Sequence, residues 1–217
     1  MKYEELAVEL AKKGVIAVLE IEKTEDAALV SKALLDGGIS AIELALRTDA
    51  AEPSISIIAK ETPQMTIGIG TIIKKGQAKR VQGLGASFGL APGLNKEIVR
   101  EAKEAGLPFI PGIATPSEIE EALSEGLNIL KFFPAQPLGG LEYLKSMNNP
   151  YNYLGLKYVP LGGVNESNLA DYASMPQIVA IGGTWIAPRA LIKEKNWNEI
   201  TQRAEKALGI WRKAKNG

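Results

Sequence analysis

A lysine interrupts the apolar run Ile-Leu-Lys-Phe-Phe-Pro at residues 129–134. Lysine side chains are almost never fully buried unless they are paired, yet Lys131 has isoleucine, leucine and phenylalanine on both sides. Burial lowers the pKa of an amine, and a neutral lysine amine attacks carbonyl carbon to form a Schiff base. The run therefore indicates covalent chemistry on a carbonyl substrate.

A second run, Ala-Ile-Glu-Leu-Ala-Leu-Arg-Thr at residues 41–48, carries a carboxylate and a guanidinium on one face of a strand. Because side chains alternate along a strand, Glu43 and Arg47 share one face while the leucines share the other. We expect the leucine face to meet helices, so that Glu43 and Arg47 point inward, as Lys131 does. Glu43 is then a candidate general acid and base, and Arg47 is a candidate partner for a substrate carboxylate.

Each of these interpretations has a structural alternative. Lys131 and Glu43 could form a buried ion pair with no chemical role, although such pairs contribute little net stability. Arg47 could be a solvated charge at the end of a strand. Thr71, which follows Gly-Ile-Gly, could bind a substrate carboxylate or only cap its strand, and Pro92 is expected to shape a loop.

Two glycine pairs, Gly162-Gly163 and Gly182-Gly183, end later apolar runs, and Thr184 follows the second pair. Residues without side chains let backbone N–H groups approach an oxyanion. Tight turns use such pairs as well. Together they predict a phosphate-binding end of the site, assembled from backbone amides and the Thr184 hydroxyl.

The composition excludes several classes of function. The 217 residues include no histidine and no cysteine, which removes His-dependent acyl-transfer triads and the usual ligands of zinc. The 25 basic and 25 acidic residues are interspersed, whereas nucleic-acid binding requires a basic stripe. No apolar run approaches the ~18 residues of a membrane span, and the first residues lack a signal-sequence pattern. We expect a cytoplasmic protein that binds neither nucleic acid nor membrane.

About eight strand-like runs alternate with helical patterns from end to end. This alternation predicts a parallel sheet, and the number of units fits a single (β/α)₈ TIM barrel domain over residues 1–217 with an extra N-terminal helix. An open dinucleotide-binding sheet fits less well, because no G-x-G-x-x-G follows the first run. The candidate residues then lie at the C-terminal ends of the strands, where such barrels carry their chemistry. The predicted strands span residues 15–21, 41–46, 65–71, 87–92, 108–113, 128–134, 157–163 and 178–184.

The motifs IELALRT, GIGT, APG, PGIATPSE, LKFFPA, PLGGVN and IGGTW occur in this order at successive strand ends. With them the chain resembles the 2-keto-3-deoxy-6-phosphogluconate (KDPG) aldolase family, which includes bifunctional enzymes that also cleave 4-hydroxy-2-oxoglutarate. The resemblance implies a homotrimeric class I aldolase that needs no metal and no cofactor. Its implied substrates are small 2-keto acids, and KDPG cleavage would give pyruvate and glyceraldehyde 3-phosphate.

The resemblance also implies roles for individual residues. Lys131 matches the Schiff-base lysine and Glu43 the general acid/base. The substrate-binding residues would be Arg47 and Thr71 on the pyruvate carboxylate, Pro92 and Phe133 around the pyruvate, and Gly162, Gly163, Gly183 and Thr184 at the phosphate. Leu161 stands where the family commonly has threonine, near the hydroxylated middle of the substrate, which leaves the preferred configuration at C4 and C5 open.

Three other functions stay open at this point. The chain could be a 2-keto-3-deoxy-6-phosphogalactonate aldolase, since Leu161 removes a hydroxyl from the site. It could be a phosphate-binding isomerase or epimerase that uses no covalent lysine. It could also be a catalytically silent binding protein that retains the barrel.

Overall fold

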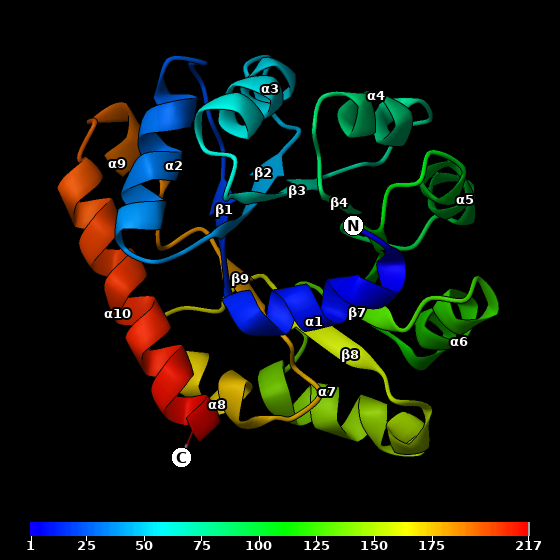
Figure 1. Cartoon of the computed structure of the whole chain (residues 1–217). Coiled ribbons are helices and arrows are strands. Elements are labelled where there is room, and N and C mark those ends of the chain that lie inside the picture. The colour runs from blue at the N-terminus through cyan, green and yellow to red at the C-terminus, as the bar shows by residue number, and fades with distance from the viewer. Residues whose placement is uncertain (217) are drawn as a thin grey trace.

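Strands and helices alternate along the whole chain in the computed structural model, which describes residues 1–216, the side chain of residue 216 excepted (Figure 1). In chain order the elements are α1 (Tyr3–Lys13), β1 (Val15–Leu19), α2 (Asp26–Asp36), β2 (Ala41–Ala45), α3 (Ala51–Glu61), β3 (Thr66–Gly70), α4 (Gln77–Gly83), β4 (Phe88–Leu90), α5 (Lys96–Glu104), β5 (Phe109–Ile110), β6 (Gly112–Ile113), α6 (Pro116–Ser124), β7 (Ile129–Phe132), α7 (Gly140–Asn148), the 3₁₀ helix η1 (Asn149–Leu154), β8 (Lys157–Pro160), α8 (Leu169–Ser174), β9 (Ile181–Gly183), α9 (Arg189–Lys193) and α10 (Trp197–Asn216).

The strands pair in parallel and form two curled sheets, one with the order β5-β4-β3-β2-β1-β9 and one with the order β6-β7-β8. The prediction of a continuous eight-stranded sheet is therefore met only in part. The predicted strand at 108–113 is divided at Pro111 into β5 and β6, and a proline has no N–H to donate to a ladder. On the other side, a single parallel bridge joins Tyr158 of β8 to Ile178, ahead of β9.

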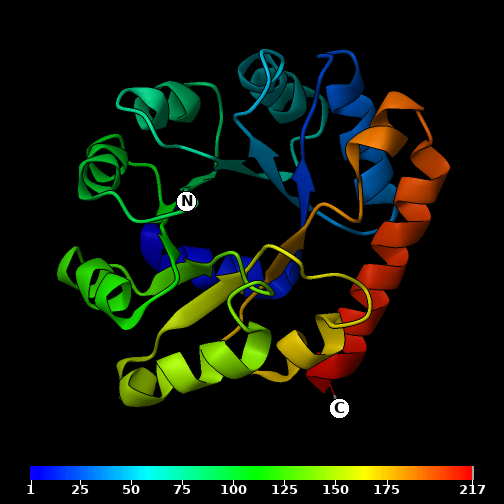
Figure 2. The same cartoon turned by 180° about the vertical axis from the view of Figure 1, so that it is seen from behind.

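Helices surround the strands, and α1 lies across one end of them (Figure 1); Figure 2 looks onto the opposite end, with α1 behind the strands. The Tyr3 hydroxyl of α1 accepts hydrogen bonds from the Asn128 and Ile129 N–H groups, both at 2.9 Å, where β7 begins. Leu6 and Leu10 pack against the inner side chains of the strands. The extra N-terminal helix therefore covers the N-terminal ends of the strands, and the C-terminal ends, here called the mouth, face away from it.

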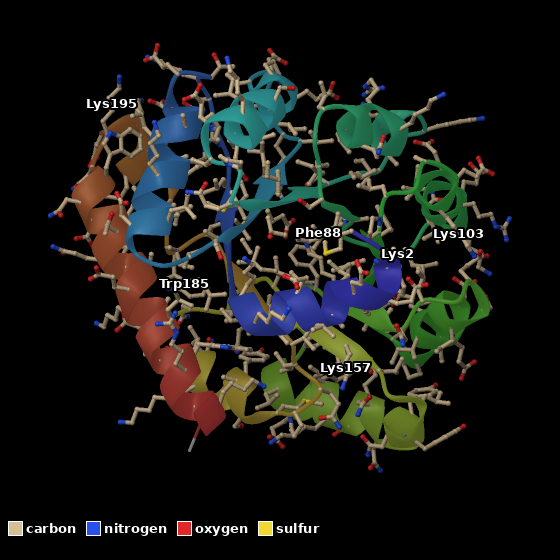
Figure 3. All side chains as sticks on the ribbon, viewed as in Figure 1. Lys2, Phe88, Lys103, Lys157, Trp185 and Lys195 are labelled. Atoms are coloured by element: carbon tan, nitrogen blue, oxygen red, sulfur yellow. The ribbon has the colours of Figure 1, made fainter. Side chains whose placement is uncertain are left out.

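The apolar side chains form two layers, as the period of two predicts. The inner layer contains Ile16, Val18, Phe88 and Val159, while Ile42 and Leu44 of β2 belong to the outer layer beneath the helices. Phe88, labelled in Figure 3, lies over Gly68, where a Cβ would come within 2.4 Å of the ring. The small residue on β3 thus leaves room for an aromatic ring inside the strands.

The PGIATPSE motif forms the start of α6. Pro116 occupies the first turn, and Thr115 and Glu118 form a capping box in which the Glu118 carboxylate accepts from the N–H groups of Ala114 (2.8 Å) and Thr115 (2.9 Å). The Tyr143 hydroxyl donates to the Ala114 carbonyl at 2.8 Å. The PGIATPSE motif therefore caps α6, and the Tyr143 hydrogen bond connects this cap to α7.

Across residues 1–216, no helix has both the length and the hydrophobicity that a bilayer crossing requires.

Candidate active site

Lys131 of β7 and Glu43 of β2 meet inside the ring of strands. The Lys131 Nζ donates to the Glu43 Oε1 at 2.9 Å, and the two side chains are 5% and 3% exposed. The two residues lie in different sheets, so the curling of both sheets brings the amine and the carboxylate together. Both point inward, as the alternation of their strands predicts.

The second oxygen of Glu43 distinguishes this pair from a purely structural one. Glu43 Oε2 is buried, and none of the described residues forms a hydrogen bond with it. Such an atom costs about 1–3 kcal/mol, and buried ion pairs that stabilise a fold have their remaining lone pairs satisfied. The free oxygen instead suits a carboxylate that must accept and return a proton. The arrangement therefore favours chemistry over the structural alternative.

Glycine on the neighbouring strand makes room for the carboxylate. A Cβ on Gly70, at the end of β3, would lie 2.1 Å from Glu43 Oε1 and 2.7 Å from its Cδ. Glu43 Oε1 therefore lies against both Gly70 and the Lys131 amine, which leaves the carboxylate little room to move. Lys131 is confined as well, with its amine 5.2 Å from the centroid of the Phe133 ring.

Arg47 and Thr71 lie together at the mouth, beyond the ends of β2 and β3. The Arg47 Nε donates to the Thr71 Oγ1 at 3.3 Å. Thr71 has a φ of 65°, which is unusual for a β-branched residue and recurs at functional sites. A guanidinium beside a hydroxyl is suited to a carboxylate ligand. The structure thus brings these two predicted binding residues together above the Lys131–Glu43 pair.

The sequence interpretation missed Glu20, which directly follows β1 and accepts from the Arg47 Nη1 at 2.7 Å. The signal was present in the alternation of β1, since Ile16 and Val18 are inner residues and Glu20 continues their face. It was missed because the contact depends on where β1 ends relative to β2.

Phe133 directly follows β7, and the loop that carries Pro92 approaches β6. Phe133 is half-buried and packs against the inner layer. Pro92 is exposed, in the loop after β4. A Cβ on Gly112 would lie 2.2 Å from the Pro92 carbonyl oxygen, so this glycine lets that loop approach β6. Gly112 pairs with Lys131 between β6 and β7, so the Pro92 loop comes close to the strand position of Lys131, while the Phe133 ring lies 5.2 Å from the Lys131 amine.

The predicted phosphate end forms the turns after β8 and β9. Gly162 and Gly163 have φ values of 90° and 84°, a region that favours glycine, and a Cβ on Gly163 would lie 2.5 Å from the Gln136 Cβ. Leu161 is buried in the inner layer. Thr184 is exposed, whereas Gly183 is buried with its α-carbon against the Trp185 ring, so only the backbone of Gly183 is available to a ligand.

Within residues 1–216, no three Asp or Glu side chains cluster in a way that could hold a metal ion. The acidic groups at the mouth instead form ion pairs with arginines. Glu20 pairs with Arg47 and Arg189, and Glu22 pairs with Arg189. The hydrogen bond from Arg189, followed by its charge, lowers the pKa of the Glu22 carboxyl below its usual value.

Comparisons with known proteins agree with this geometry. Residues 6–203 match the family model described as KDPG and KHG aldolase. The 2-dehydro-3-deoxy-phosphogluconate aldolase of Treponema pallidum is 37% identical over 196 residues, which cover 90% of this chain and 92% of that protein. The KHG/KDPG aldolase of Escherichia coli K12 is 35% identical over 194 residues, covering 89% and 90%.

Among solved structures, the KDPG aldolase of Legionella pneumophila, with pyruvate captured at low pH as a covalent carbinolamine intermediate, superimposes with a TM-score of 0.88. It is 36% identical, and the match covers 93% of this chain and 97% of that one. The family model spans most of the chain, and the relatives match it nearly end to end. The chain belongs to the KDPG and KHG aldolase family.

Proposed function

We propose that this protein is a class I aldolase that cleaves 2-keto-3-deoxy-6-phosphogluconate to pyruvate and glyceraldehyde 3-phosphate through a Schiff base on Lys131. One observation carries the proposal. A buried amine lies 2.9 Å from a buried carboxylate whose other oxygen has no hydrogen-bond partner within residues 1–216. An amine that can give its proton to an adjacent base becomes a nucleophile.

In the first half of the reaction, Glu43 takes a proton from the Lys131 amine along their hydrogen bond. The neutral nitrogen attacks the C2 ketone, and Glu43 returns the proton so that the carbinolamine loses water. The product is a protonated imine, which is an electron sink at C2.

In the second half, Glu43 removes the proton of the C4 hydroxyl and the C3–C4 bond breaks. Its electrons move into the imine and form an enamine, and the aldehyde leaves. Protonation of the enamine at C3 and hydrolysis of the imine release pyruvate and restore the lysine. Every proton transfer uses the one carboxylate, which explains why packing fixes its position so closely.

The binding roles follow from where the residues lie. Arg47 and Thr71 would hold the keto-acid carboxylate, because their contact places a cation and a hydroxyl side by side at the mouth. Phe133, against the Lys131 amine, would line the pyruvate pocket together with Pro92. The tail of the substrate would bind at the β8 and β9 turns, through the backbone of Gly162, Gly163 and Gly183 and the Thr184 hydroxyl.

Two related substrates remain candidates. The relative in Escherichia coli is named for activity on KHG as well as KDPG, and 4-hydroxy-2-oxoglutarate would give pyruvate and glyoxylate by the same steps. The buried apolar Leu161 keeps the 2-keto-3-deoxy-6-phosphogalactonate alternative open, because its side chain offers no hydrogen bond that would select one configuration of a substrate hydroxyl.

For the assembly, we propose a single domain whose strands close into an eight-stranded barrel, and a homotrimer in the cytoplasm. The hydrogen bond from Lys131 N to the Pro111 carbonyl (2.9 Å) and the bridge between Tyr158 and Ile178 support closure between the two sheets. Light scattering of the purified protein tests the trimer, and a monomer or dimer mass would contradict it.

The decisive experiment is reduction with borohydride in the presence of pyruvate. An imine-forming enzyme gains a stable pyruvate-derived mass on Lys131, whereas an isomerase or a silent binding protein gains none. Lys131→Ala should lose both the adduct and pyruvate release from KDPG. Lys157→Ala is the matched control, because Lys157 begins β8 at the opposite end of the strands (Figure 3) and should retain both. An adduct that persists in Lys131→Ala, or its absence in the parent protein, would refute the proposal.

A further inference from the structure

A row of polar contacts crosses the mouth from strand to strand. Thr71 accepts from the Arg47 Nε (3.3 Å), Glu20 accepts from the Arg47 Nη1 (2.7 Å), and the other Glu20 oxygen accepts from the Arg189 Nη1 (3.2 Å). These residues follow β3, β2, β1 and β9, which are consecutive in the six-stranded sheet. The row thus crosses four neighbouring strand ends, with Glu20 bridging its two arginines.

Glu20 lies one layer above the Lys131–Glu43 pair. Val18 pairs with Glu43 between β1 and β2, and Glu20 is two residues further along the same inward face. Its side chain is 16% exposed, while those of Arg47 and Arg189 are 48% and 56% exposed. The carboxylate is thus more buried than either arginine, and the arginines reach it from the solvent side.

Arg47 needs such a partner if it is to bind a substrate in one orientation. An arginine that is half exposed has many rotamers, and fixing it on binding reduces affinity. Here Thr71 holds the Nε and Glu20 holds one terminal nitrogen. Among the described residues, neither the other terminal nitrogen of Arg47 nor the hydroxyl hydrogen of Thr71 has a hydrogen-bond partner, so both remain available to a ligand.

We propose that Glu20 is a positioning residue that holds the Arg47 guanidinium in the orientation that receives the carboxylate of a 2-keto acid. This inference rests on the proposed function, in which Arg47 binds that carboxylate. Arg189 holds Glu20 in turn and offsets its charge, which limits repulsion between Glu20 and the bound anion. Positioning depends on a hydrogen-bond acceptor at residue 20, so glutamine should largely replace glutamate and alanine should not.

Pyruvate is the probe that isolates the effect of Glu20 on carboxylate binding, because it has the carboxylate and the ketone of the substrate but lacks the phosphorylated part. The measurement is the amount of borohydride-trapped adduct on Lys131 as pyruvate is varied, which gives a half-saturating concentration. Glu20→Ala should raise that concentration about three- to tenfold, as expected for one unfixed arginine, with trapping at saturation within about twofold of the parent. Glu20→Gln should recover most of the affinity.

Glu22→Ala is the matched control. Glu22 also pairs with Arg189 and is 48% exposed, but it has no hydrogen bond to Arg47 in the described part of the chain. Its half-saturation should match that of the parent. An unchanged or lower half-saturating concentration in Glu20→Ala would overturn the inference, and so would Glu20→Gln weakening pyruvate as much as Glu20→Ala. Absence of any adduct in the parent protein would instead refute the proposed function, and the inference with it.

Discussion

Replacing Gly70 by alanine should disable the reaction without altering either reacting residue. The new Cβ would lie 2.1 Å from Glu43 Oε1, whereas ordinary contact begins at 3.4 Å, so the oxygen must withdraw by about 1.3 Å. It cannot move toward Lys131, whose amine is already 2.9 Å away. The carboxylate must therefore leave the line along which it exchanges protons.

A displacement of about 1 Å in a reacting group can cost roughly 10²-fold in rate, which is about 2.7 kcal/mol in activation free energy. We therefore expect Gly70→Ala to lower kcat for pyruvate release about 100-fold. Gly70 is outside the positive-φ region, so alanine fits the backbone and only the side-chain clash operates. The assay couples pyruvate to lactate dehydrogenase, and thermal unfolding confirms that the variant is folded.

Two further variants complete the experiment. Gly209→Ala is the control, since a Cβ at this position of α10 meets no atom within 4 Å, and its activity should be unchanged. Glu43→Gln adds no volume and should lower kcat by about 10²–10⁴-fold through loss of proton transfer. The reasoning is refuted if a folded Gly70→Ala retains kcat within about threefold of the parent, because Glu43 would then not need its observed position.

The remaining predictions concern substrate choice and stability. Leu161→Thr places a hydroxyl in the inner layer, and the ratio of kcat/KM for the gluconate- and galactonate-configured substrates should change by about tenfold or more; an unchanged ratio would show that this position does not read configuration. Thr115→Ala removes the cap of α6 and should lower the free energy of unfolding by about 1 kcal/mol in urea titrations, with kcat unaffected. The hydrogen bond from Arg100 lowers the pKa of Glu125 in the folded protein. The ion pair therefore stabilises the fold fully above the pKa of about 4.3 that glutamate has in the unfolded chain. This stabilisation is lost as the pH falls through the lower pKa of the folded state. The melting temperature of Glu125→Gln should accordingly fall less steeply below about pH 5 than that of the parent. If the two proteins give parallel plots of melting temperature against pH, the Arg100–Glu125 pair does not contribute as predicted.

The inward positions of Glu43 and Lys131 could be predicted from the sequence because side-chain alternation does not depend on where a strand begins or ends. The boundaries were less accurate. The predicted strand at 157–163 ends at Pro160, and the predicted strand at 178–184 begins only at Ile181. Residues 161–163 leave the ladder in a bend, and Ile178 forms only an isolated bridge with Tyr158 before β9 begins, although the apolar pattern continues through these residues.

Contacts between distant segments could not be predicted in the same way. Glu20 and Arg189 are 169 residues apart, and nothing in either local sequence specifies the other. The division of the fifth strand depends on a proline within an apolar run, which by itself is compatible with an edge, a bulge or a break. Sequence patterns thus predicted that Lys131 and Glu43 face inward, whereas the contact between Glu20 and Arg47 became evident only from the fold.

The cost of the Lys131–Glu43 pair explains why the surrounding residues are arranged as they are. Two buried ionisable groups and one unsatisfied oxygen are unfavourable for stability, and apolar residues of similar size would often serve the fold equally well or better. The glycine at residue 70 adds to this cost, since it contributes no apolar side chain to the inner layer and is entropically unfavourable in a strand. Each feature is unfavourable alone, and all become necessary if a carboxylate must exchange protons with an amine at a fixed distance. The position of the pair, joined from two sheets at the centre of the strands, is therefore better explained by catalysis than by folding.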